Sequence, residues 1–68
     1  MLLQDIFRKN LSKLMEERSL TVYQIEKKSG MSDSHLRSIV QGKYGTTLRV
    51  VENVCKALGV DPVAMLTD

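Results

Sequence analysis

The sequence contains one cysteine, one proline, one histidine and no tryptophan. Cys55 alone cannot form a disulfide within the chain, so a domain of 68 residues must be held together by packing or by self-association. The histidine and the cysteine are far apart in the sequence, which argues against a catalytic triad or a metal cluster, and there is no glycine-rich phosphate loop. We therefore expect no catalytic residues, no metal site and no cofactor.

Long hydrophobic runs are also missing. No apolar stretch approaches the ~20 residues needed to span a bilayer, and no basic segment precedes an apolar one as in a secretion signal. Hydrophobic residues still make up 43% of the chain, enough for a packed core. The glycines are scattered and leave no flexible linker, so we expect a single domain over residues 1–68. Because the sequence shows neither a membrane-spanning stretch nor a secretion signal, we expect the protein in the cytoplasm and without a membrane partner. The net charge of +2 only weakly favours a nucleic-acid partner.

The stretch from Thr21 to Gly42 predicts two short helices joined by a tight turn. Thr21 and Gln24 have the capping-box spacing, in which each side chain bonds the backbone N–H of the other. Gly30 can take the left-handed conformation that ends a helix. Ser32 or Asp33 can cap the next helix, which ends at Gly42.

The second of these helices, residues 33–41, has distinct inner and outer faces. Leu36, Ile39 and Val40 share one face at three- and four-residue spacing. The opposite face and its flanks carry polar or charged groups: Ser34, Ser38 and Gln41, with Asp33, His35 and Arg37 beside them. The helix is therefore expected to pack inward and to present hydrogen-bonding groups outward.

Three further helices flank this pair. Residues 3–18 carry an apolar stripe of Leu3, Ile6, Phe7, Leu11, Leu14 and Met15. Thr47 is the expected cap of a helix that ends at Gly59 and buries Leu48, Val51, Val54, Cys55 and Leu58. Asp61 and Pro62 form a cap and a first helical position for a last helix through about Thr67. The fold class is thus all-α with five helices.

Residues spread over most of the chain resemble one family in register. They are Leu20, Ile25, Gly30, Leu36, Ile39, Gly42, Lys43, Leu48 and the run Ala57-Leu58-Gly59-Val60. This pattern, from about Phe7 to Leu66, is similar to that of the phage repressor and Cro type of helix-turn-helix protein, the XRE family. The resemblance implies a compact lambda-repressor-like domain whose second and third helices form the helix-turn-helix.

The resemblance also implies which residues contact DNA. The family's base-reading positions fall on Asp33, Ser34 and Ser38, with Arg37 beside them. Its phosphate positions fall on Ser32, Gln41 and Lys43, and the following loop and helix start add Tyr44, Thr46, Thr47 and Arg49. Asp33 has two open interpretations, a helix cap only or an acceptor from a cytosine amino group. Arg37 is expected at a guanine or a phosphate, or else in an ion pair with Asp33 or Glu26.

Some positions depart from the family pattern. Met15 and Val40 stand where the family often has an arginine and a glutamate that pair between the first and third helices. Replacing both partners of such a pair with apolar groups is tolerated, so we predict that Met15 and Val40 are in contact. Val22 replaces a glutamine that reaches toward bases, and Glu26 replaces a small residue.

The function that this resemblance implies is a sequence-specific transcriptional regulator that binds double-stranded DNA as a homodimer on a two-fold operator. Val63, Met65 and Leu66 are too apolar for a free short helix, so some are expected to close the core and the others to form a dimer contact. No small-molecule ligand is expected. The alternative is a protein-interaction or antitoxin-like module with weak DNA reading. The charges Arg8, Lys9 and Lys13 are interpreted as a solvated face, with phosphate contact as the alternative.

Overall fold

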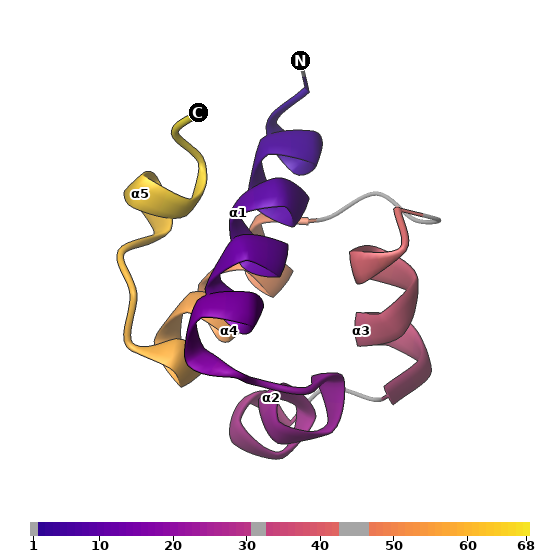
Figure 1. The fold of residues 1–68 in the computed structure, drawn as a ribbon. Coiled ribbons are helices and arrows are strands. Elements are labelled where there is room, and N and C mark those ends of the chain that lie inside the picture. The colour runs from indigo at the N-terminus through magenta and orange to yellow at the C-terminus, as the bar shows by residue number, and fades with distance from the viewer. Residues whose placement is uncertain (1, 31–32, 43–46) are drawn as a thin grey trace.

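The computed structural model describes residues 2–30, 33–42 and 47–68, except for the side chains of residues 33–35. Over these residues the chain forms helices and no strand: α1 (Leu3–Arg18), α2 (Val22–Ser29), α3 (Asp33–Val40), α4 (Leu48–Leu58) and α5 (Pro62–Met65). Figure 1 shows α1 in the middle, with α3 on one side, α5 on the other and α2 across the lower end. The prediction of an all-α, five-helix fold is confirmed.

Most helix ends are set by the residues that the sequence indicated. The Oγ1 of Thr21 accepts a hydrogen bond from the Gln24 N–H at 3.2 Å, and the Gln24 Oε1 accepts from the Thr21 N–H at 2.9 Å, which completes the capping box. Gly30 has a φ of 75°, the left-handed conformation that glycine adopts without strain. The Oδ1 of Asp61 accepts from the Val63 N–H at 3.0 Å and starts α5.

The core lies where all five helices meet. Phe7 and Leu11 of α1 are fully buried, and they belong to one hydrophobic cluster with apolar side chains from each of the other helices. The buried partners are Ile25, Leu36, Ile39, Val50, Val51, Val54, Cys55, Leu58 and Met65. Burial of this kind drives helix packing because it removes apolar surface from water.

Two expected core residues are exposed, so those predictions were wrong. Leu3 is 60% exposed and Leu48 is 73% exposed. Each is the first residue of its helix and lies beyond the edge of the core, although its sequence position continues the apolar stripe. Val50, which the stripe omitted, is buried instead. The helix α5 is also shorter than expected and ends at Met65 rather than near Thr67.

Polar side chains of α1 hold the C-terminal part of the chain. The Nδ2 of Asn10 donates to the backbone oxygens of Met65 at 2.8 Å and Thr67 at 3.1 Å. The Nη1 of Arg18 donates to the backbone oxygen of Leu58 at 2.8 Å, at the end of α4. These contacts fix α5 and the end of α4 against α1, which leaves the opposite side of α1 for α3 (Figure 1).

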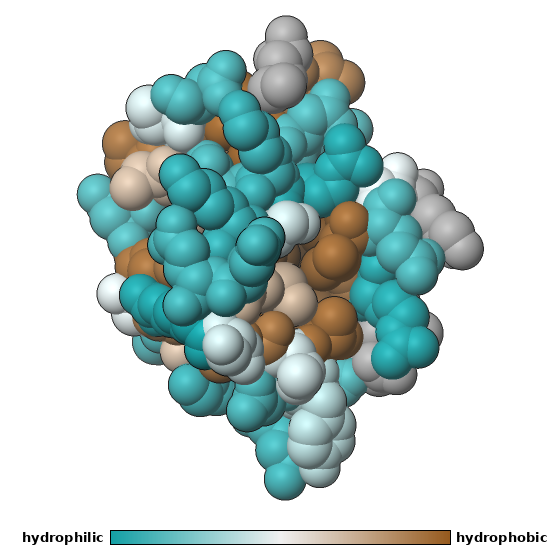
Figure 2. Space-filling view, in the orientation of Figure 1, coloured by the Kyte–Doolittle hydropathy of each residue, from teal (hydrophilic) through white to brown (hydrophobic). Residues whose placement is uncertain are grey.

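The seam between α1 and α3 is apolar at the surface. Met15 and Val40 are both half-buried and pack against the core. Figure 2 shows hydrophobic side chains at the surface between α1 and α3. An apolar environment suits Met15 and Val40 at the two positions where the family often has a paired arginine and glutamate. The direct contact between Met15 and Val40 stays a prediction.

Candidate nucleic-acid interface

The helix α3 lies at the edge of the molecule with one face buried. Leu36 and Ile39 are 0% and 1% exposed and face the core, in contact with α2 and α1. Arg37 is exposed and Ser38 is half-buried. The inward face expected from the 3.6-residue period is therefore present, and among the described side chains of α3 Arg37 is exposed to solvent.

The remaining expected base-reading residues, Asp33 and Ser34, belong to the first turn of α3. Their side chains are outside the described residues, so both interpretations of Asp33 stay open. Among the expected phosphate contacts, Gln41 is exposed directly after α3, and Thr47 and Arg49 are exposed at the start of α4. The other members of that set lie outside the described residues: Ser32, Lys43, Tyr44 and Thr46.

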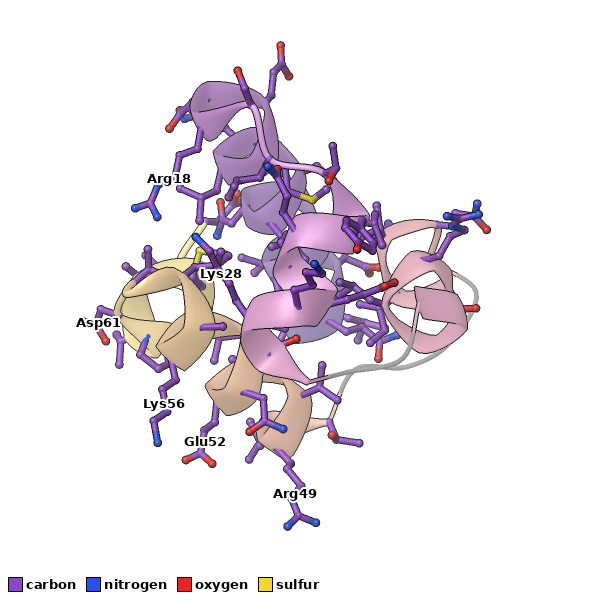
Figure 3. All side chains as sticks on the ribbon, turned by 90° about the horizontal axis from the view of Figure 1, so that it is seen from below. Arg18, Lys28, Arg49, Glu52, Lys56 and Asp61 are labelled. Atoms are coloured by element: carbon purple, nitrogen blue, oxygen red, sulfur yellow. The ribbon has the colours of Figure 1, made fainter. Side chains whose placement is uncertain are left out.

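The start of α4 has the groups that suit a phosphate. The Oγ1 of Thr47 accepts from the Val50 N–H at 3.2 Å, which confirms Thr47 as the helix cap. A hydroxyl that accepts a hydrogen bond can still donate one, so Thr47 can bind an anion while it caps the helix. Arg49 extends away from the ribbon at this end of α4 (Figure 3). A cation, a hydroxyl and a helix N-terminus together attract an anion.

The helix α2 contributes less to this surface than the family pattern implies. Val22 is half-buried and packs against the core, so its side chain acts in packing. Glu26 is also half-buried. Tyr23 is 61% exposed, and the Nζ of Lys27 lies 5.0 Å from the centre of its ring, a cation–π contact on the surface.

A feature that the sequence interpretation missed lies at the end of α3. Gly42 has a φ of 77°, and a Cβ at this position would overlap the guanidinium of Arg8 from α1. The Nη2 of Arg8 is 3.4 Å from the Oδ1 of Asp5, one turn earlier in α1. No sequence pattern indicates this contact, because residues 8 and 42 come together only through the packing of α1 on α3.

The three residues expected to close the core or to form a dimer contact differ in their exposure. Met65 is 6% exposed and belongs to the core of one chain, the first of the two roles expected for this group. Val63 is 70% exposed on α5, and Leu66 is half-buried. Val63 and part of Leu66 thus remain accessible to a second chain.

The described residues offer neither a membrane-spanning helix nor a cluster of metal-ligating side chains. Over the described ranges, no helix is long and apolar enough to cross a membrane, and no three His, Cys, Asp or Glu side chains come together as metal ligands. Cys55 is fully buried. Burial raises the pKa of its thiol above the ordinary value, and the charge of Asp61 raises it further.

Comparison with known proteins points to one family. Residues 10–64 match the model of the Cro/C1-type HTH DNA-binding domain. The chain is also 33% identical over 58 residues to an uncharacterized HTH-type transcriptional regulator, y4dJ, of Sinorhizobium fredii. That alignment covers 85% of this chain and 75% of the relative. No solved structure matches the chain.

Proposed function

Because the chain belongs to the Cro/C1-type helix-turn-helix family of DNA-binding transcriptional regulators, we propose that it reads a specific operator through α3. The observation that carries this proposal is the placement of α3, with Leu36 and Ile39 buried and Arg37 open to solvent. A helix held in this way can enter the major groove while its inner face stays in the core. Residues 1–68 would form one DNA-binding domain.

The proposed contacts divide into two groups. Side chains of α3 would face base edges: Asp33, Ser34, Arg37 and Ser38. Backbone phosphates would be bound by residues of the turn before α3, of the connection after it and of the start of α4: Ser32, Gln41, Lys43, Tyr44, Thr46, Thr47 and Arg49. Serine donates and accepts, so it discriminates weakly, whereas arginine can bind guanine with two hydrogen bonds. Arg37 would therefore contribute most of the sequence preference.

The proposed DNA-binding form is a homodimer. The support is the apolar surface of α5 and of the residue after it, where Val63 is 70% exposed and Leu66 is half-buried. Two copies related by a two-fold axis would place their α3 helices in successive major grooves, roughly 34 Å apart. We propose that the protein acts in the cytoplasm by occupying promoter DNA, without catalysis and without a small-molecule ligand.

The test is selection of binding sites from random duplex DNA with the purified protein, followed by a salt titration on the enriched site. We expect a palindrome with half-sites about one helical turn apart and a log affinity that falls steeply against log salt concentration. Sedimentation of the protein–DNA complex should give two chains per site. One chain per site with a single enriched half-site would refute the dimer and retain the DNA-binding domain.

The competing function is a protein-interaction or antitoxin-like module. Its support is that Val22 packs inward where a base-reading glutamine would stand, and that Glu26 is half-buried on the helix-turn-helix. Shallow, sequence-independent binding with no enriched site would favour it over operator reading. The Arg37 side chain on the open face of α3 weighs against it.

A further inference from the structure

Arg8 connects the start of α1 with the end of α3. It precedes Met15 by seven residues, about two helical turns, so both side chains lie on the same side of α1. The Arg8 guanidinium lies against Gly42, close enough that a Cβ there would overlap it. Gly42 directly follows Gln41, and both come after the last residue of α3. Arg8 thus reaches the end of the proposed recognition helix from a different helix.

The guanidinium of Arg8 is held only loosely. Within the described residues its one hydrogen bond is to Asp5, at the long distance of 3.4 Å, and the side chains of Arg8 and Asp5 are each 39% exposed. An exposed pair of this kind contributes little to stability. A guanidinium has five N–H donors, so most of them are not used by described groups. Arg8 is therefore a half-exposed cation with donors available at the edge of the proposed interface.

We propose that Arg8 is an additional DNA phosphate contact, which rests on the proposed binding of DNA by α3. The residues on either side of Gly42 are Gln41 and Lys43, both proposed phosphate contacts. A cation that lies over Gly42 can bind the same stretch of DNA backbone. The planar guanidinium of arginine can bind two oxygens of a phosphate at once. Because Gly42 has no side chain, the Arg8 guanidinium can lie beside the backbone of Gly42.

Asp5 has a defined role in this arrangement. It accepts one weak hydrogen bond from the guanidinium in the free protein, so it competes with the phosphate for that donor. A phosphate that replaces the weak 3.4 Å bond makes a shorter, charge-assisted bond. Removing the carboxylate should therefore favour the DNA-bound form.

The experiment compares Arg8→Gln with Lys13→Gln in salt titrations on the enriched site. Lys13 is an exposed cation of the same helix, about 140° around from Arg8, in a groove with Val60 and Met65 on the α5 side. Arg8→Gln should lower the slope of log affinity against log salt by about one unit, and Lys13→Gln should leave it unchanged. Asp5→Asn should keep the slope and tighten binding about 1.5- to 5-fold.

The outcomes separate this proposal from the function on which it rests. A normal slope in Arg8→Gln would overturn the contact even if affinity fell, since a loss without a slope change means that Arg8 only positions α3. If the Arg8→Gln protein melts at a lower temperature than wild type, Asp5→Asn becomes the deciding variant, because it leaves the Arg8 guanidinium in place. Unchanged or weaker DNA binding by Asp5→Asn would then overturn the phosphate contact of Arg8. A wild-type protein without an enriched site would overturn the operator function and, with it, the role of Arg8.

Discussion

Thr47 caps α4 in the structure and has a proposed role at DNA, and substitutions can separate the two roles. Its Oγ1 accepts the Val50 N–H at 3.2 Å, and its hydroxyl hydrogen is available to a phosphate. Thr47→Asp keeps an acceptor at the cap but places a negative charge where the phosphate is expected. Thr47→Ala removes the cap and the hydroxyl together. Thr47→Asn is the matched control, because it keeps the cap, stays neutral and can still donate.

The sizes of the effects follow from the geometry. Loss of a cap hydrogen bond costs about 1 kcal/mol. For 68 residues the entropy of unfolding is roughly 0.14 kcal/mol per kelvin, so Thr47→Ala should melt about 7 °C lower. Thr47→Asp should melt near the wild-type temperature, since aspartate is a good cap and its charge suits a helix N-terminus. A carboxylate about 4 Å from a phosphate costs about 1 to 4 kcal/mol, roughly a five-fold to several-hundred-fold loss in affinity.

The assay is a thermal melt followed by circular dichroism, together with fluorescence anisotropy on the enriched DNA site at two salt concentrations. The expected pattern is a stable Thr47→Asp protein with weak DNA binding and a Thr47→Asn protein close to wild type in both. Wild-type affinity in Thr47→Asp would remove Thr47 from the DNA interface. Equal melting of Thr47→Ala and wild type would show that the cap hydrogen bond contributes nothing measurable.

Further predictions concern a base contact, a thiol and the attachment of α5. Arg37→Ala should cost about 1–3 kcal/mol on the enriched site and relax the preference at one base pair, and an equal loss on random DNA would reassign Arg37 to the backbone. Burial raises the pKa of Cys55, so its contribution to the free energy of unfolding is full below the ordinary thiol pKa of about 8.5 and is lost as the pH rises above it. Denaturant titrations should show a smaller alkaline loss for Cys55→Ala. Asn10→Ala removes hydrogen bonds to the backbone of Met65 and Thr67 and should cost about 1–3 kcal/mol, with faster amide exchange confined to α5; uniform exchange would refute that local role.

The helix ends were predictable because their signals are local. Thr21 and Gln24 satisfy each other over three residues, and Gly30 ends α2 through its own backbone conformation. Asp61 caps α5 in the same way. Each of these interactions joins residues so close in the chain that spacing alone brings them together.

The polar contacts between helices were not predictable from the sequence. Asn10 and Arg18 donate to backbone oxygens 40 or more residues away, and a backbone oxygen has no sequence signature. The position of Arg8 over Gly42 likewise depends on how α1 crosses α3. The burial of an apolar residue can also depend on helix packing. Leu48 continues the apolar stripe of α4, which indicated burial, but the start of α4 lies outside the core and Leu48 is exposed.

Locally encoded helix ends also bear on how soon a new chain can act. Helical domains whose contacts are mostly close in sequence fold within microseconds to milliseconds. Synthesis of 68 residues at about 5–20 residues per second takes about 3 to 14 s. Folding of α1 to α5 would therefore add almost nothing to the interval between translation and a folded chain, so the synthesis and the pairing of chains would set how quickly the proposed binding form accumulates.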